Sequence, residues 1–161
     1  MKKILFVLLL SVSAMLYAQD KVQIYDTLAD ARNDLRQAIQ LAGQENKHVL
    51  VQVGGNWCPW CVRLHDFFLS ETVIDSVLKA DYVLVRINYS KENKNPETMA
   101  LLEYPQRFGF PALVILDAEG NRLHTQNTAY LEQDKGYNAE KVKGFLLDWN
   151  RAAINPVSYQ K

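Results

Sequence analysis

The sequence predicts an α/β fold of three layers, in which helices cover both faces of a central mixed β-sheet. Three observations support this prediction. Short apolar runs with the length of strands alternate along the chain with longer segments of helical periodicity. The segment Asp-Ala-Glu-Gly-Asn, 117–121, indicates a hairpin turn between two of the strands. The chain has 161 residues, of which 48% are hydrophobic, and this is typical of one domain with its own core.

The first half of the chain predicts strand, helix, strand. Residues 22–25 are expected to form a short edge strand. Residues 28–43 carry apolar side chains at spacings of three and four, which predicts a helix, and Gly43 is a plausible end for it. Residues 48–53 are apolar enough to form a central strand.

The second half continues the alternation, so that the full order is β-α-β-α-β-α-β-β-α. A helix from Pro59 to about Ser70 is followed by a short helix to Lys79, whose buried residues are expected to be Val73, Val77 and Leu78. The other expected elements are a strand at 82–87, a helix at 97–108 broken or kinked by Pro105, strands at 112–116 and from 122 to 125, and a helix at 139–153. Residues 126–137 show no clear pattern. We expect one domain over 22–153 and a frayed tail over 154–161.

Residues 1–18 have the pattern of a secretory signal peptide. Lys2 and Lys3 precede an apolar stretch, 4–16, and Ala18 offers a small residue for cleavage. The apolar stretch is shorter than the roughly 20 residues that a membrane-spanning helix needs. We therefore expect cleavage, no stable membrane anchor afterwards, and a periplasmic or secreted protein.

Charge excludes some partners. The chain has 18 Lys and Arg residues and 18 Asp and Glu residues, so its formal net charge is zero. Neither sign is concentrated in a way that would suggest binding to nucleic acid or to an anionic membrane. We expect no nucleic-acid partner.

The only two cysteines, Cys58 and Cys61, lie where the strand at 48–53 gives way to a helix. Two thiols separated by two residues can close a disulfide within one helical turn and open it again. Free backbone N–H groups and the helix dipole stabilise a thiolate at a helix start, which lowers the pKa of Cys58 below the usual thiol value of ~8.5. Pro59 suits the first helical position. The pattern predicts thiol–disulfide exchange.

The cysteine pair could also have a structural, metal-binding or client-binding role. A structural disulfide would close too short a loop to add much stability. A zinc site made of Cys58, Cys61 and His65 would lack a fourth ligand. Copper handling by the two thiols, or client binding by the flat apolar surfaces of Trp57 and Trp60 without turnover, remain as alternatives. The favoured prediction includes no bound metal and no cofactor.

Together, the order of elements and the Trp-Cys-x-x-Cys motif after the second strand resemble the thioredoxin superfamily over about 22–153. Arg86-Ile87-Asn88 matches the end of the family's third strand. The segment 108–112, Phe-Gly-Phe-Pro-Ala, stands where the family places a cis-proline before its fourth strand. With the signal peptide, the chain is similar to exported bacterial thioredoxin-like proteins. The resemblance implies a thioredoxin-like three-layer sandwich.

The resemblance also implies roles for individual residues. Cys58 would be the attacking thiolate and Cys61 the resolving thiol. A cis bond before Pro111 would bring the backbone of Phe110 beside Cys58, where an extended substrate could add as a strand. The residues expected to bind substrate are Trp57, Pro59, Trp60, Phe110 and Pro111.

One position departs from the family pattern. Many thioredoxins have a buried Asp six residues before the first cysteine, and Gln52 stands there in this chain. Because an amide does not titrate, proton transfer to and from Cys61 is expected to use water or another group.

The favoured function is reduction of disulfides in exported proteins by dithiol exchange, with electrons from a membrane thiol donor. The absence of a His between the cysteines favours reduction. Disulfide oxidation or isomerisation by the same fold is the alternative, because the direction of exchange depends on the reduction potential.

Overall fold

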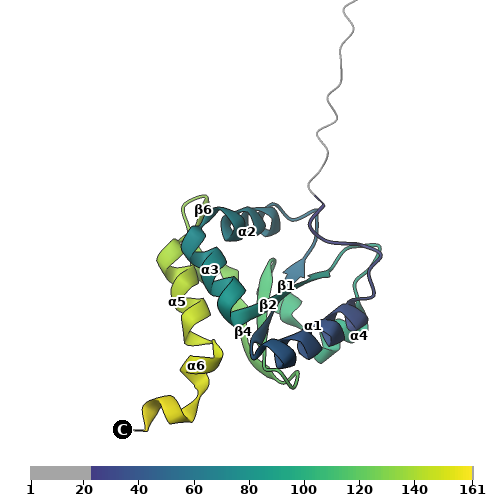
Figure 1. Ribbon diagram of the computed structural model, residues 1–161. Coiled ribbons are helices and arrows are strands. Elements are labelled where there is room, and N and C mark those ends of the chain that lie inside the picture. Colours follow the sequence, from purple (N-terminus) through teal and green to yellow (C-terminus); the bar gives the residue numbers. More distant parts are fainter. Residues whose placement is uncertain (1–22, 161) are drawn as a thin grey trace, which may run out of the picture.

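A computed structural model describes residues 23–160, and its centre is a four-stranded mixed sheet (Figure 1). The strand order is β2-β1-β3-β4, in which β1 pairs parallel with β2 and antiparallel with β3, and β3 pairs antiparallel with β4. The strands are β1 (His48–Gly54), β2 (Tyr82–Asn88), β3 (Ala112–Leu116) and β4 (Arg122–Asn127). This architecture confirms the predicted fold class. The predicted signal peptide, 1–18, lies outside the described residues.

The helices cover both faces of the sheet, with α1 and α4 on one face and α2, α3 and α5 on the other (Figure 1). The α-helices are α1 (Ala31–Glu45), α2 (Pro59–Ser70), α3 (Thr72–Asp81), α4 (Pro96–Leu101), α5 (Ala139–Asp148) and α6 (Arg151–Ile154). Shorter elements are 3₁₀ helices at Pro105–Phe108, Thr128–Leu131 and Pro156–Tyr159, and a small hairpin of β5 (Glu132–Gln133) and β6 (Gly136–Tyr137). Among residues 23–160, none of the helices is both long and apolar enough to cross a membrane.

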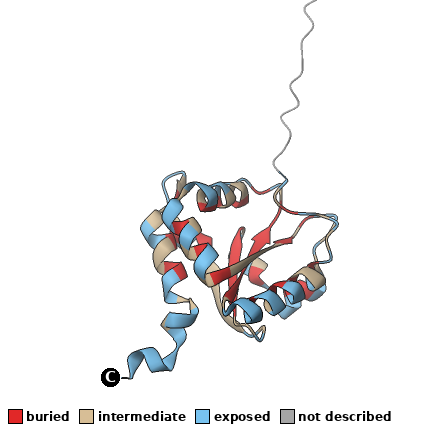
Figure 2. Cartoon of the chain, viewed as in Figure 1, coloured by how far each residue is buried: buried red, intermediate tan, exposed pale blue. Residues whose placement is uncertain are grey.

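Strand β1 is buried along its whole length and separates two hydrophobic cores (Figure 2). Successive side chains of a strand point to opposite faces of the sheet. Val49, Val51 and Val53 accordingly pack with α1, whereas Leu50 packs with α2, α3 and α5. Gln52 has the same parity as Leu50, so the strand period directs its side chain to the face that carries α2.

The predicted strand at 22–25 is wrong, because its described residues, 23–25, form no strand. The side chain of Asn56 forms the hydrogen bonds with the backbone of this segment that a neighbouring strand would otherwise form. The Asn56 Oδ1 atom accepts hydrogen bonds from the backbone N–H groups of Ile24 and Tyr25, at 2.9 and 3.0 Å, and its amide donates to the Tyr25 carbonyl at 2.8 Å. Backbone groups that are paired in this way do not require a neighbouring strand.

Helix α1 begins and ends later than predicted, and capping explains both ends. Asp30 accepts a hydrogen bond from the Asn33 backbone N–H and starts the helix at Ala31, whereas Leu28 is 92% exposed. The helix passes Gly43 and ends where Asn46 adopts a left-handed conformation.

Three further helix predictions need correction. In α3 the buried residues are Ile74 and Leu78; Leu78 was predicted, whereas Val73 is 55% exposed. The segment at 97–108 is broken, as one of the two predicted alternatives had it, but the break precedes Pro105: α4 ends at Leu101, and positive φ angles at Glu103 and Tyr104 separate it from the 3₁₀ helix that begins at Pro105.

The last helix, predicted to run to residue 153, stops at Asp148. Asn150 caps a separate turn, α6, by accepting a hydrogen bond from the Ala153 backbone N–H. The segment that follows, within the predicted tail of 154–161, forms the exposed 3₁₀ helix Pro156–Tyr159.

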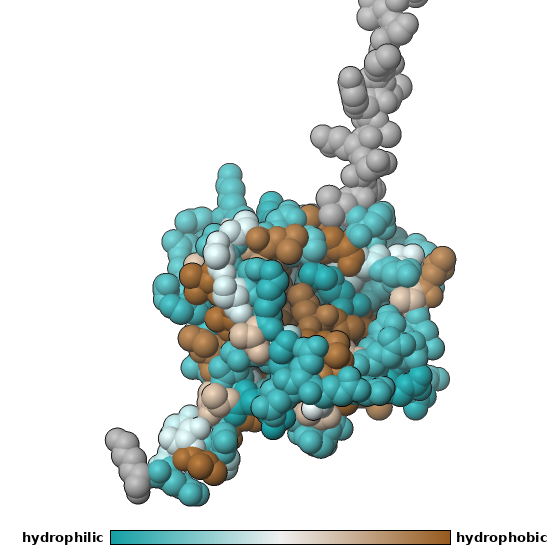
Figure 3. All heavy atoms as spheres, viewed as in Figure 1, coloured by the Kyte–Doolittle hydropathy of each residue, from teal (hydrophilic) through white to brown (hydrophobic). Residues whose placement is uncertain are grey.

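Strand β2 forms one edge of the sheet, and a hollow with hydrophobic lining runs beside it between α1 and α3 (Figure 3). Leu41, Leu78 and Val83 contribute to its walls. Lys79 and Arg86 also line the hollow. Charged side chains at an edge oppose pairing with a strand of another chain.

Candidate active site

Cys58 and Cys61 are joined in a disulfide at the start of α2, with their Cα atoms 5.3 Å apart. Cys58 is the N-cap residue, Pro59 is the first helical residue, and the Cys61 backbone N–H donates to the Cys58 sulfur at 3.2 Å. The site therefore lies at the carboxyl end of β1, where the sequence placed it. In the disulfide state Cys58 is only 3% exposed and Cys61 is fully buried.

The backbone of Gly54 lies directly against the disulfide. A Cβ atom at Gly54 would lie 2.5 Å from the Cys61 sulfur and 2.7 Å from the Tyr25 hydroxyl oxygen. Real Cβ atoms do not approach other atoms so closely, so only glycine fits. No local sequence pattern marks this position, because the close approach involves side chains from α2 and from the segment before α1.

Tyr25 reaches the back of the disulfide from the N-terminal segment. Its side chain is 2% exposed and packs in one cluster with Cys58 and Cys61. The hydrogen bonds of Asn56 to the backbone of residues 24 and 25 hold it there. Neither Tyr25 nor Asn56 was among the residues predicted for the site, and no local sequence pattern identifies them.

Polar side chains from β1 and β2 lie beside Tyr25 and Cys61. Gln52 is fully buried and donates to the Cys61 carbonyl at 3.3 Å. Burial lowers the pKa of Arg86 and raises that of Tyr25, with Arg86 and Gln52 partly opposing the effect on Tyr25. The Tyr25 hydroxyl therefore stays protonated at neutral pH.

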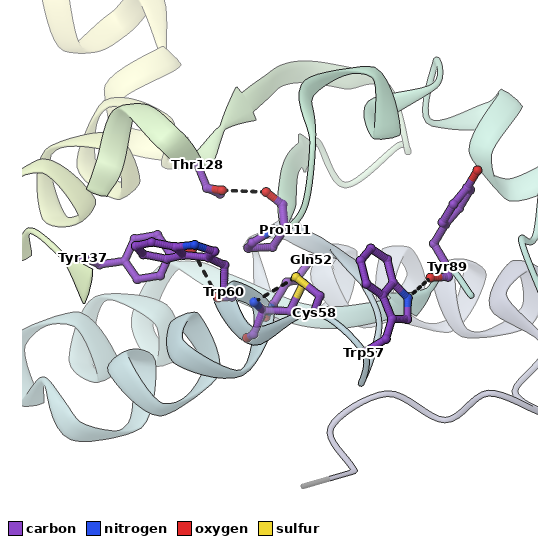
Figure 4. The surroundings of a disulfide bond; sticks show 9 residues. Gln52, Trp57, Cys58, Trp60, Tyr89, Pro111, Thr128 and Tyr137 are labelled. Carbon is purple, nitrogen blue, oxygen red and sulfur yellow. Dashed lines mark hydrogen bonds between the residues drawn. A yellow bond between two sulfur atoms is a disulfide. The ribbon is translucent and has the colours of Figure 1, made fainter. Parts of the chain in front are cut away.

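An aromatic group stands on each side of Cys58. On one side the Trp57 ring meets Phe110 edge to face, with 5.3 Å between centroids, and Phe110 contacts Tyr89 at 5.0 Å. The Trp57 indole N–H donates to the Tyr89 carbonyl at 2.7 Å (Figure 4). This bond fixes the orientation of Trp57, although its ring is 55% exposed.

On the other side, Trp60 meets Tyr137 edge to face, with 5.5 Å between ring centroids (Figure 4). The Tyr137 hydroxyl donates to the Trp60 carbonyl at 3.3 Å, and the Arg63 guanidinium lies 4.7 Å from the Trp60 ring centroid. Arg63 is exposed, and its guanidinium covers one face of this ring.

Pro111 faces the disulfide from the loop before β3 (Figure 4). Its peptide bond with Phe110 is cis, and Phe110 packs against the cluster that contains the two cysteines. The Thr128 hydroxyl donates to the Pro111 carbonyl at 2.6 Å and is itself buried. Thr128 lies in the segment to which the sequence assigned no structure, so its contact with this loop could not be anticipated.

The structure brings together every predicted site residue: Trp57, Cys58, Pro59, Trp60, Cys61, Phe110 and Pro111. In the described part of the chain, no three His, Cys, Asp or Glu side chains are grouped so that they could hold one metal ion. His65 lies on α2, and burial lowers its pKa.

A helix-capping cysteine pair after a central strand, opposite a cis-proline, defines a class of proteins with the thioredoxin fold. The chain belongs to the thioredoxin-like family, whose model matches residues 30–118. That match covers α1 to β3 and includes both cysteines and Pro111, and it confirms the resemblance drawn from the sequence.

Curated relatives and solved structures agree with this assignment. The chain is 28% identical over 93 residues to the disulfide bond reductase DsbH of Chlamydia pneumoniae, covering 54% of this chain and 56% of DsbH. It is 29% identical over 103 residues to the thiol:disulfide interchange protein DsbD of Salmonella typhi, covering 64% of this chain and 17% of DsbD. The matches thus span less than two thirds of either relative.

Two solved structures show the same fold. A disulphide isomerase from Xylella fastidiosa Temecula1 has a TM-score of 0.69 at 23% identity, covering 79% of this chain and 96% of its own. The C-terminal domain of Neisseria meningitidis DsbD, in its oxidised form, has a TM-score of 0.52 at 20% identity, covering 78% and 100%.

Proposed function

We propose that the protein is a thiol–disulfide oxidoreductase that reduces disulfides of exported proteins through Cys58 and Cys61. The observation that carries the proposal is the disulfide at the start of α2, which lies between two aromatic groups and faces Pro111. A short-range disulfide in this position stabilises the fold little, so a chemical role accounts for it better.

The reaction begins with the reduced pair. The Cys58 thiolate attacks one sulfur of a substrate disulfide, forms a mixed disulfide and releases the first substrate thiolate. Cys61 then loses its proton to that thiolate, attacks the Cys58 sulfur and releases the second substrate thiolate. Two electrons have then passed from the cysteine pair, now oxidised to the Cys58–Cys61 disulfide, to the substrate. The helix start stabilises the Cys58 thiolate when it attacks and when it leaves.

The site suits an extended polypeptide. Trp57 and Trp60 offer flat apolar surfaces on either side of Cys58, and the backbone before Pro111 is available for strand-like pairing. A pocket of about 460 Å³ beside Trp57, lined also by Tyr89 and Lys94, extends this surface away from the disulfide. The signal-peptide pattern at 1–18 supports exported proteins as substrates and a periplasmic or secreted location.

The direction of exchange follows from the reduction potential, and we expect a value near that of thioredoxin, about −270 mV. The absence of a His between the cysteines supports reduction, as does the name of the DsbH relative. Equilibration of the pair with defined glutathione or dithiothreitol buffers measures the potential. A value near −120 mV would instead mark an oxidase, for which a membrane thiol donor is not needed.

Replacing Cys61 with serine is expected to stop the reaction at the mixed disulfide. The Cys61→Ser variant retains the attacking thiolate but cannot resolve the intermediate, so covalent complexes with disulfide-containing exported proteins should accumulate. Non-reducing gels followed by mass spectrometry detect them. The Cys58→Ser variant is the matched control and should capture far less. Equal capture by both variants would contradict the assignment of Cys58 as the attacking residue.

A further inference from the structure

The Tyr25 hydroxyl is a buried polar group beside the resolving cysteine. A point at the Cβ position of Gly54 lies 2.7 Å from the Tyr25 oxygen and 2.5 Å from the Cys61 sulfur, so these two atoms are separated by no more than the sum of those distances. The hydroxyl lies near the Gln52 amide but makes no hydrogen bond of normal length and angle among residues 23–160. Buried polar atoms are normally paired, and an orphan at a reactive sulfur requires an explanation.

Other polar groups lie around Cys61, and among them the buried Nδ1 atom of His65 and the buried Nε atom of Arg86 also lack a partner in the described part of the chain. The Gln52 amide nitrogen is already bonded to the Cys61 carbonyl, and its Oε1 atom, also without a partner among the described residues, is an acceptor only. The charged and titratable groups packed around this corner are Arg86 from β2, His65 from α2 and Tyr137 from β6. Tyr25 is the residue whose polar atom meets the Cys61 sulfur at the Gly54 Cβ position, at 2.7 and 2.5 Å from that point.

We propose that the Tyr25 hydroxyl donates a hydrogen bond to the Cys61 sulfur in the reduced protein and stabilises the Cys61 thiolate as it attacks the mixed disulfide. The inference rests on the proposed exchange reaction and gives Tyr25 a stabilising role, distinct from the proton transfer that an Asp at position 52 would perform. Tyr25 keeps its own proton throughout, because burial raises its pKa. The Cys61 proton leaves with the first substrate thiolate, as described above.

The disulfide state explains why the hydroxyl is unpaired. A sulfur in a disulfide is a weak acceptor, whereas a thiolate accepts a strong, charge-assisted hydrogen bond. Tyr25 therefore gains its partner only when the pair is reduced. Removing the hydroxyl should weaken the reduced, ionised state and leave the oxidised state unharmed, because an unpaired buried group contributes no stability.

Reaction of the reduced protein with Ellman's reagent separates the two steps. Cys58 attacks first and releases one equivalent of the coloured thiolate, and Cys61 releases the second when it resolves the mixed disulfide. In Tyr25→Phe we expect an unchanged first phase and a second phase roughly tenfold slower at pH 7, the factor given by one hydrogen bond to a charged group. The pH profile of the second phase should move to higher pH, since the Cys61 pKa rises.

Tyr82→Phe is the matched control. It also removes a buried tyrosine hydroxyl, but that group donates to the Leu146 carbonyl and is not part of the cluster around the sulfurs. Both phases should keep their wild-type pH profiles. Thermal melts of the oxidised proteins should show Tyr25→Phe to be at least as stable as wild type.

The outcomes distinguish the inference from the proposed function. If Tyr25→Phe resolves with the wild-type pH profile, or if its oxidised form melts lower than wild type, the role of Tyr25 is overturned while exchange itself stands. If wild-type protein gives no second phase, so that Cys61 does not resolve the mixed disulfide, the exchange reaction and the inference both fail.

Discussion

Replacing Cys58 with serine is expected to abolish disulfide exchange while the fold persists. A serine hydroxyl is not ionised at neutral pH, so the helix start has no anion to stabilise and the attack cannot occur. The disulfide is also lost, but it closes a loop between residues only three apart and adds little stability. Reduction of insulin by dithiothreitol, followed by turbidity, should fall from the catalysed to the uncatalysed rate.

Two controls make this result interpretable. Circular dichroism of Cys58→Ser should match that of wild-type protein in dithiothreitol, which also lacks the disulfide. Wild-type protein must accelerate insulin reduction clearly. If wild type and variant are equally inactive with insulin and with mixed-disulfide reagents, the catalytic proposal is wrong and a binding role becomes the better interpretation.

Replacing Gly54 with alanine is expected to damage both stability and exchange. The added methyl group would overlap the Cys61 sulfur and the Tyr25 hydroxyl, at 2.5 and 2.7 Å. Both neighbours are buried in a packed cluster, so relieving the overlap requires α2 or the N-terminal segment to shift. Overpacking of this kind costs about 1–3 kcal/mol. Denaturant unfolding of the oxidised protein measures the loss, and insulin reduction should slow as well.

Gly144→Ala is the matched control, because it makes the same chemical change inside α5. Nothing lies within 4 Å of a Cβ atom at Gly144, and alanine favours a helix interior by roughly 0.5–1 kcal/mol over glycine. That variant should be as stable as wild type or more stable. If Gly54→Ala behaves like Gly144→Ala, the close approach described here does not exist in the folded protein.

Most of the secondary structure could be predicted because its signals are local. The largely apolar run of β1 predicts a central strand, and Pro59 after Cys58 predicts the start of α2. Some errors come from local caps that the apolar pattern does not show, such as Asn46 and Asn150, and others arise where a signal comes from another segment. Residues 23–25 have the composition of a strand, but Asn56, some thirty residues away, binds their backbone instead.

The candidate site divides in the same way. Cys58, Cys61 and the two flanking tryptophans are adjacent in the sequence, so their spacing identifies them. Pro111 was placed through its resemblance to a family motif. Thr128 and Tyr25 carry no motif, because each acts through one contact with a residue distant in the chain.

The sequence by itself determined the class of fold and the reactive pair, since both are encoded in short-range patterns of apolar residues and in the spacing of two thiols. Only the tertiary structure decided what surrounds the buried sulfur of Cys61. Gly54 belongs to β1, and Tyr25 belongs to the segment before α1. Their contact depends on packing between segments that are distant in the chain, and no local sequence pattern predicts such packing.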